Sequence, residues 1–401
     1  MRAPAEFLLE QPGALQPFFQ PIISVADGRI FGYEALARLR VGDEQRSLGA
    51  FFSSADRTRE EKLNLDRRLR SLSLQRAREA NISERLFLNI HPSWISARYA
   101  EELDFPTLQI IDETGFPAEQ VVIEIIEEEI RHEDFDLLNR LLDRYRERGM
   151  KIAIDDFSYP NFDRLISLRP DFVKVDIRLI RKSVESAEYR RLIRYIGEFS
   201  QELGVAVLFE GVETLVELEN SIEAGGSLVQ GFFFSEARED FQAPDVHQGR
   251  IRLGLNNITY RAMLKSESTL RIEDSMNRYL ALVIAREQVF VRSNLDEALS
   301  RIAAFLPPQC FRAFICDGLG IQRSSNFTRT SGDQFKFYPE YRGKNWAWRP
   351  YFFPNVVRMR AVQRGVVSNR YVDFETRRHT LTFSYPLGSD LYIFLDFDAE
   401  H

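Results

Sequence analysis

KIAIDDFSYPNFDRL, residues 151–165, contains the change of pattern that decides the fold. Its first part, KIAI, is a short apolar run that predicts a buried strand. Two adjacent carboxylates, Asp155 and Asp156, end the run. The turn that follows carries SYPN (158–161), where glycines would be expected after a catalytic pair of carboxylates. The stretch therefore predicts a strand that delivers two acids to an unusual loop.

The same alternation of short apolar runs and helical patterns fills residues 18–235. One helical stretch, FDLLNRLLDRYRERG (135–149), ends in Gly149 as an expected C-cap. Apolar strands that alternate with helices imply a parallel sheet covered on both faces. The number of units favours a closed, TIM-like (β/α)8 barrel over an open doubly wound sheet. No G-x-G-x-x-G motif opens a helix, which argues against a dinucleotide-cofactor fold. The expected strand runs are GYEAL (32–36), LFLNI (86–90), VVIEII (121–126), KIAIDD (151–156), DFVKVD (171–176), AVLFEGVE (206–213) and SLVQGFFF (227–234).

Composition indicates a globular protein of two domains. The 401 residues are 44% hydrophobic and 28% charged, and the net charge of −7 disfavours nucleic acids and anionic membranes as partners. Cys310 and Cys316 form no disulfide framework, which fits a reducing compartment. No apolar run approaches the roughly 20 residues of a membrane span, and MRAPAEFLLE (1–10) is not a signal peptide. We therefore expect a cytoplasmic protein.

The pattern changes after residue 250. Ile272, Met276, Leu280 and Val283 recur at helical spacing, which predicts a long connecting helix. From residue 311, aromatic-rich strand patterns return and predict a small α+β domain on an antiparallel sheet. The expected domains are a barrel at 1–250, a helical connector at 251–306 and a C-terminal domain at 307–401.

Polar side chains end the predicted strands of the barrel. The carboxyl ends of parallel barrel strands meet at one mouth, so these side chains would converge. Several carboxylates at one site repel unless cations neutralise them, and carboxylate and amide oxygens suit Mg²⁺ or Mn²⁺. Two such ions form the usual clamp for phosphodiester hydrolysis. The residues are Glu34, Asn89, Glu124, Asp155, Asp156, Lys174, Glu210 and Gln230.

Two simpler interpretations compete with a clustered site. A single acid is most often a solvated surface charge, and an acid at a strand end can cap the next helix. The repetition of the same placement at successive strand ends favours the cluster.

GYEALARLR (32–40) resembles the signature of EAL domains, which bind and hydrolyse cyclic di-GMP. The other landmarks of this family follow in order, and the resemblance covers residues 18–237. They are FQPI (19–22), LFLNIHP (86–92), VIEIIE (122–127), DDF (155–157), FVKVD (172–176), FEGVET (209–214) and VQGFFFS (229–235).

The resemblance implies roles for these residues. One Mg²⁺ or Mn²⁺ ion would be held by Glu34, Asn89, Glu124 and Asp155, and a second would be reached by Asp155 and Asp156. Ca²⁺ would be a non-productive occupant. Cyclic di-GMP would be opened to linear pGpG by a homodimer. The catalytic residues implied are Lys174, Glu210, Asp156 and Glu127, and the substrate-binding residues are Gln20, Arg38, Gln230 and Glu213.

Three positions depart from the family pattern. Ile126 replaces the usual Thr of E-x-T-E, Ala237 replaces a Pro, and SYPN (158–161) replaces a glycine loop that packs against the position of Glu127. Bulky residues and proline do not adopt positive φ as glycine does. Two hypotheses therefore remain open: slow or conditional hydrolysis, and a receptor that binds cyclic di-GMP without hydrolysing it.

Residues 344–360 and 368–386 resemble the PAS/Cache-like domain of YkuI-type EAL proteins. Aromatic walls with one Arg and one Asp would suit a small zwitterionic or carboxylate ligand. The alternative is that the aromatics are core residues and the ion pair is structural. The candidate pocket residues are Trp346, Trp348, Arg349, Tyr351, Tyr371, Asp373 and Thr376.

Overall fold

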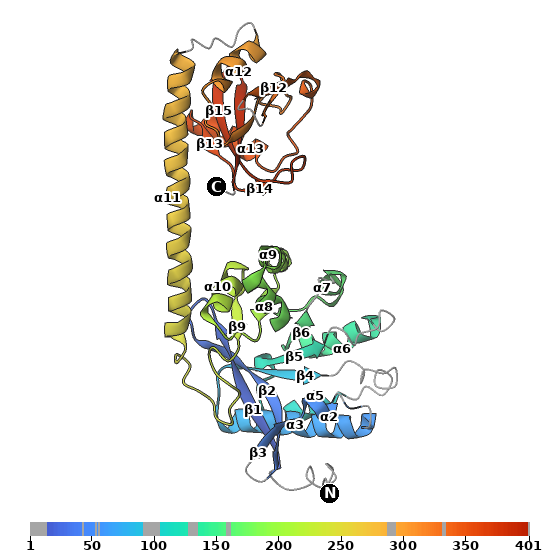
Figure 1. The fold of residues 1–401 in the computed structure, drawn as a ribbon. Helices are drawn as coiled ribbons and strands as arrows, with labels where there is room; N and C mark the ends of the chain where they lie inside the picture. Colours follow the sequence, from blue (N-terminus) through green and yellow to red (C-terminus); the bar gives the residue numbers. More distant parts are fainter. Residues whose placement is uncertain are drawn as a thin grey trace. The chain divides into compact units, whose positions relative to one another are not determined.

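The computed structural model describes residues 14–41, 44–52, 54, 57–90, 105–126, 135–157, 162–286, 294–330 and 334–399. The chain divides into two compact units, Met1–Thr259 and Tyr260–His401 (Figure 1). The expected boundaries at 250 and 306 stay predictions.

In the described part of the first unit, eight strands close into a barrel in the order β1-β9-β8-β7-β6-β5-β4-β2, with β2 paired back to β1. The TIM-like barrel is therefore confirmed. One detail differs from a fully parallel barrel, because β1 runs antiparallel to both β2 and β9. A further strand, β3, pairs with β2 outside the ring. The strands are β1 (Leu15–Ser24), β2 (Ile30–Val41), β3 (Glu44–Ser47), β4 (Arg85–Ile90), β5 (Val121–Ile126), β6 (Lys151–Phe157), β7 (Phe172–Val175), β8 (Ala206–Phe209) and β9 (Leu228–Gln230).

Helices surround the barrel strands (Figure 1). A cluster of buried apolar side chains fills the space between helices and strands. Gly149 ends one helix in the left-handed region at φ 83°, as expected of a C-cap. The helices are α2 (Gly49–Phe52), α3 (Arg59–Glu79), α5 (Pro106–Thr114), α6 (Phe135–Glu147), α7 (Phe162–Leu168), α8 (Ile177–Glu185), α9 (Ala187–Glu202) and α10 (Leu215–Glu223), with a 3-10 helix at Ala118–Gln120.

A second apolar cluster fills the barrel interior. Each of the strands β4 to β9 contributes one apolar residue to this cluster, and the residue two positions further along the chain is polar. Side chains two positions apart on a strand point to the same face. The interior therefore has an apolar layer below and a polar layer at the mouth. Gly32 makes room for this packing, since a Cβ there would lie 2.9 Å from the ring of Phe87. The apolar layer consists of Ile22, Phe87, Val122, Ala153, Phe172, Leu208 and Leu228.

The second unit is built on an antiparallel sheet in the order β12-β11-β10-β16-β15-β13, with β14 paired to β15. Apolar side chains of α11, α12 and α13 pack on this sheet. The expected α+β domain is confirmed, and α11 continues through the boundary between the units as the expected long helix. The elements are α11 (Gln248–Arg286), α12 (Leu295–Ala303), β10 (Cys310–Asp317), β11 (Asn326–Arg329), β12 (Phe335–Tyr338), a 3-10 helix (Pro339–Tyr341), α13 (Phe352–Val362), β13 (Val366–Val367), β14 (Tyr371–Val372), β15 (His379–Gly388) and β16 (Leu391–Asp398).

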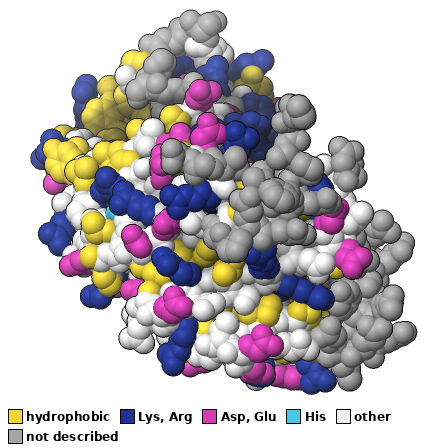
Figure 2. All heavy atoms as spheres, turned by 90° about the horizontal axis from the view of Figure 1, so that it is seen from below, with side chains coloured by type: hydrophobic (Ala, Val, Ile, Leu, Met, Phe, Trp, Pro, Cys, Tyr) yellow, Lys and Arg dark blue, Asp and Glu magenta, His cyan; other side chains and the backbone are white. Residues whose placement is uncertain are grey.

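Charges of both signs are mixed on one face of the molecule. Over the described part of the face in Figure 2, basic and acidic side chains are interspersed. Among the helices of the described residues, none is long and apolar enough to cross a membrane.

Candidate active site at the barrel mouth

Lys174 of β7 lies at the centre of the polar layer and is 1% exposed. Its Nζ lies 2.6 Å from Glu210 Oε1, 2.7 Å from Glu124 Oε1, 3.1 Å from Asp155 Oδ1 and 3.6 Å from Glu34 Oε1. Glu34, Glu124 and Asp155 lie on β2, β5 and β6, and Glu210 directly follows β8. The structure thus brings together the acids that the sequence placed at the ends of separate strands.

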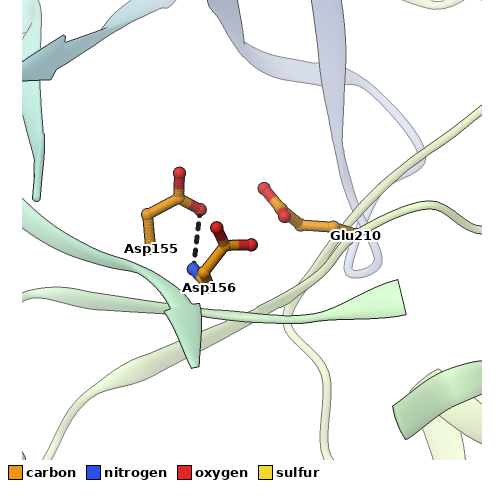
Figure 3. A group of neighbouring side chains, drawn as sticks. All are labelled: Asp155, Asp156 and Glu210. Atoms are coloured by element: carbon orange, nitrogen blue, oxygen red, sulfur yellow. Dashed lines mark hydrogen bonds between the residues drawn. The ribbon is translucent and has the colours of Figure 1, made fainter. Parts of the chain in front are cut away.

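A β-bulge brings two adjacent acids to the same side. From Ile154 to Phe157, β6 runs three residues over an interval in which β7 runs two. Adjacent side chains of a regular strand point to opposite faces. The extra residue, with Asp156 in the left-handed region at φ 56°, removes this alternation. Asp155 and Asp156 both line the mouth and, with Glu210, have carboxylate oxygens within 4.8 Å of one another (Figure 3).

Burial and mutual repulsion set the protonation of these groups. Burial raises the pKa of Glu124 and of Glu210 well above the usual range, although Lys174 opposes the shift. Burial also raises the pKa of Asp156, and the charge of Asp155 adds to this effect. Burial alone would lower the pKa of Lys174, but the surrounding carboxylates raise it well above its usual value. Lys174 is therefore a fixed positive charge.

The donor atoms at the mouth fit a divalent metal ion. Glu124 is fully buried, and its Oε2 has no hydrogen-bond partner among the described residues. Unpaired buried carboxylate oxygens are costly unless a cation binds them. Asp155, Asp156 and Glu210 form the described group of acids close enough to share an ion. Oxygen-only donors of this kind suit Mg²⁺, Mn²⁺ or Ca²⁺.

Amide side chains hold Glu34 in place. Gln230 Nε2 donates to Glu34 Oε2 at 2.7 Å and to Gln20 Oε1 at 3.2 Å, and Asn89 Nδ2 donates to Glu34 Oε1 at 3.2 Å. Gln20, Glu34 and Gln230 line the mouth cavity, which has a volume of about 710 Å³ including its opening to solvent. Four of the sequence-predicted residues therefore form one hydrogen-bonded wall.

Of the other predicted substrate-binding residues, one lines the cavity and one does not. Glu213 lines the cavity and pairs with Arg181 at 2.8 Å. Arg38 lies on β2, four residues after Glu34, but its Nη1 donates to the carbonyl of Ala37 and its guanidinium lies over Phe18. Arg38 is not among the described residues that line the cavity. Glu127 and the segment 158–161 lie outside the described residues.

Some cavity residues were absent from the sequence prediction. Asp176 follows Lys174 by two residues and caps α8, accepting from the backbone N–H of Arg178. The aspartate at the start of a helix was a readable signal for this position. Gly211, with φ 63°, and the 63% exposed ring of Phe232 also line the cavity. Nothing in the local pattern of FEGVET or VQGFFFS indicated that these two face the mouth.

Of the candidate pocket residues in the C-terminal unit, three line a second cavity and the others lie near these three. Trp346, Arg349 and Tyr351 line a second cavity. Tyr371 stacks on Tyr351 with ring centroids 4.9 Å apart. Asp373 accepts hydrogen bonds from Arg312 and Thr376, and Trp348 is exposed with its ring against Arg349.

The fold and the mouth together define an α/β-barrel protein with an acidic, metal-type site. Comparison with known families makes this more specific. The EAL domain matches residues 6–237, and an EAL-domain associated signalling protein domain matches residues 244–401. The chain belongs to the EAL-domain family.

Individual relatives agree with this assignment. The chain is 30% identical over 382 residues to the EAL-domain containing protein YkuI of Bacillus subtilis, covering 95% of this chain and 93% of YkuI. A crystal structure of YkuI with its substrate c-di-GMP and calcium matches with a TM-score of 0.90 and 29% identity, over 100% of both chains.

Two further relatives match little more than half of the chain. The cyclic di-GMP phosphodiesterase RocR of Pseudomonas aeruginosa is 28% identical over 233 residues, which are 56% of this chain and 57% of RocR. A manganese and cyclic di-GMP complex of Klebsiella pneumoniae BlrP1 matches with a TM-score of 0.50 and 29% identity, over 57% of each chain. The chain thus spans little more than half the length of these two relatives.

Proposed function

We propose that the barrel binds cyclic di-GMP at its mouth and hydrolyses it, slowly or conditionally, to linear pGpG. The cluster of four carboxylates around buried Lys174 carries this proposal. The relatives support the substrate, since YkuI and BlrP1 have been crystallised with it and RocR is a phosphodiesterase for it.

Two divalent ions, Mg²⁺ or Mn²⁺, complete the proposed site. Glu34, Asn89, Glu124 and Asp155 would hold one ion, and Asp155 with Asp156 would reach the other. Bound ions would supply Lewis acidity and neutralise charge on the phosphate.

Lys174 and Glu210 carry the proton chemistry of the proposal. The pKa of Lys174 is too high for it to act as a base, so its role is to orient the nucleophilic water and offset negative charge. Glu210 Oε1 lies 2.6 Å from Lys174 Nζ, and burial raises the pKa of Glu210. A carboxylate with a raised pKa can hold the proton that an attacking water releases.

Side chains at and near the mouth would bind the dinucleotide. Gln20 and Gln230 present amide groups at the cavity surface, and Glu213 can accept from a guanine edge or a ribose hydroxyl. Arg38 would have to leave the carbonyl of Ala37 to bind a phosphate through its fork.

Product analysis tests the hydrolysis. The full chain is incubated with cyclic di-GMP and Mg²⁺ or Mn²⁺, and products are separated by liquid chromatography. We expect pGpG from the wild type and none from Glu34→Ala. Glu44→Ala, which removes an exposed carboxylate of β3, is the matched control and should leave the product unchanged. Absence of pGpG with both metals would refute hydrolysis.

The second candidate is a receptor that binds cyclic di-GMP without hydrolysing it. The SYPN segment at 158–161, in place of the family's glycine loop, favours this candidate. Calorimetry with recovery of the ligand separates the two: micromolar binding with intact ligand supports the receptor, and failure to bind refutes both.

The remaining expectations stay predictions. They are a homodimer, a cytoplasmic location and control of the barrel by a ligand of the C-terminal unit.

A further inference from the structure

An ion pair lies at the rim of the barrel mouth. Ile177, the first residue of α8, lines the mouth cavity, and Arg181 follows it by four residues, so both lie on one face of the helix. Arg181 Nη2 donates to Glu213 Oε1 at 2.8 Å, and Glu213 also lines the cavity. The pair therefore presents a cationic donor and an anionic acceptor side by side at the edge of the site.

This pair adds little to the stability of the fold. The Arg181 side chain is 54% exposed and the Glu213 side chain 40% exposed, and exposed ion pairs contribute little to stability. Neither side chain makes another hydrogen bond with the described residues. Donors of Arg181 and an oxygen of Glu213 are therefore available to a ligand in the cavity.

The backbone that carries Glu213 is held firmly. The segment after β8 and the turn after β9 are joined by two hydrogen bonds of 2.9 Å, from the Val212 N–H to the Gln230 carbonyl and from the Phe233 N–H to the Val212 carbonyl. The backbone N–H of Glu213 donates to Glu217 Oε2 at 2.8 Å. The acceptor is thus mounted on a preorganised backbone, which lowers the cost of binding a ligand.

The same cavity has an exposed aromatic wall, the ring of Phe232. The turn that carries this ring depends on Gly231, where a Cβ would lie 2.1 Å from the Val212 carbonyl oxygen. An exposed ring stacks on the face of a nucleobase whatever the base is. Phe232 can therefore hold a base, but only polar groups at the edge of the base can identify it.

We propose that Arg181 and Glu213 together select guanine as the base bound at this rim, an inference that rests on the proposed binding of cyclic di-GMP. The Watson–Crick edge of guanine carries two donors, N1–H and the N2 amino group, next to one acceptor, O6. The Glu213 carboxylate accepts from both donors, and the Arg181 guanidinium donates to O6.

Adenine presents the opposite pattern. Its N1 is an acceptor and would face the Glu213 carboxylate, while its N6 amino group is a donor and would face the Arg181 guanidinium. Each mismatch leaves a charged group without a partner, which is costly. Hypoxanthine lacks only the N2 amino group and loses one of the three hydrogen bonds. The affinity should therefore fall from guanine to hypoxanthine to adenine.

Calorimetric titration with three cyclic dinucleotides tests this order. The full chain is titrated with the cyclic dinucleotides of guanine, hypoxanthine and adenine in Ca²⁺, and the recovered ligand is checked for cleavage by liquid chromatography. The hypoxanthine dinucleotide should bind about tenfold more weakly than cyclic di-GMP, and the adenine dinucleotide about 100-fold more weakly.

Substitutions at the rim then assign the selection to Arg181. Arg181→Met should weaken cyclic di-GMP about tenfold but not the adenine dinucleotide, so the ratio of their Kd values falls about tenfold. Arg181→Lys keeps a cationic donor and should keep most of the ratio. Arg191→Met is the matched control, because Arg191 pairs with Glu188 at 2.8 Å on α9, and it should change neither Kd. Phe232→Leu should weaken all three dinucleotides by a similar factor, since stacking does not identify the base.

The ratio of Kd values separates selection from a structural role. If Arg181→Met leaves this ratio unchanged, either with both ligands binding as before or with both weakened equally, the inference is overturned. A wild type that binds the adenine dinucleotide as tightly as cyclic di-GMP overturns it too. In both cases the proposed binding of cyclic di-GMP still stands. Failure of the wild type to bind cyclic di-GMP would instead refute the proposed function and this inference together.

Discussion

Replacing Lys174 by Met would remove the positive charge at the centre of the mouth while keeping a side chain of similar length. In the wild type, carboxylate oxygens of Glu34, Glu124, Asp155 and Glu210 lie within 3.6 Å of its Nζ. Without the ammonium group these acids face one another in a buried site. We expect the barrel to become less stable, and divalent ions to restore much of the loss.

The size of the effect follows from the burial. Removing one partner of a buried ion pair costs about 3–5 kcal/mol. Glu124 can limit the loss by taking up a proton, since burial already raises its pKa. We therefore expect the lower end, about 3 kcal/mol, in the absence of metal. For a unit of this size that corresponds to a fall of roughly 6–12 °C in the thermal midpoint.

Lys151→Met is the matched control. Lys151 Nζ lies 2.8 Å from Asp171 Oδ1, but its side chain is 44% exposed. Exposed ion pairs contribute about 0–1 kcal/mol, so the midpoint should fall by less than about 4 °C.

Differential scanning calorimetry of the full chain, with EDTA and then with Mn²⁺, measures both variants and can separate the transitions of the two units. Equal losses in Lys174→Met and Lys151→Met would refute the reasoning. So would a loss in Lys174→Met that Mn²⁺ does not reduce, because a divalent ion should replace the missing charge.

Three further predictions concern the barrel. Gly32→Ala should lower the free energy of unfolding by about 1–3 kcal/mol in urea titrations, because the new Cβ would lie 2.9 Å from the ring of Phe87. Asp156→Gly should raise this free energy by about 1 kcal/mol while abolishing pGpG formation, because it relieves a φ of 56° at a residue proposed to reach metal. Burial, with Arg250 nearby, lowers the pKa of His247 from 6.5 to about 4. As the pH falls, the unfolded chain therefore binds this proton before the folded protein does. The free energy of unfolding should fall by up to about 3 kcal/mol between pH 6.5 and pH 4. In urea titrations at each pH, His247→Gln should show a smaller fall over this range.

The gathering of acids at one mouth could be predicted from the sequence because it depends on two regular features. Side chains alternate along a strand, and parallel barrel strands end on one side. Phe87 with Asn89, and Phe172 with Lys174, show the same spacing of an apolar and a polar residue. This spacing can be read from the strand sequences without any knowledge of the loops.

The antiparallel direction of β1 had a signal that the repeating pattern obscured. Only residues 25–29 separate β1 from β2. A crossover between parallel strands needs a dozen or more residues, so this connection permits only a hairpin. Gly28, at φ 71°, supplies the turn.

The bulge in β6 could not be predicted from the sequence, because it is a property of two paired strands. KIAIDDF alone would send Asp155 and Asp156 to opposite faces. Only the ladder with β7 shows the additional residue. In the same way, the pattern WAWR does not show that Trp348 is exposed while Arg349 is buried.

The bulge lies in the first half of KIAIDDFSYPNFDRL, before the loop that follows the two acids. Phe157 pairs again with β7 and is fully buried, so the chain is fixed immediately after the two acids. The backbone N–H of Asp176 donates to the Phe157 carbonyl at 3.4 Å on the same side. Strand pairing therefore positions Asp155 and Asp156 before residue 158 is reached. The described contacts that hold the backbone of these two carboxylates therefore come from strand pairing with β7 and its continuation at Asp176.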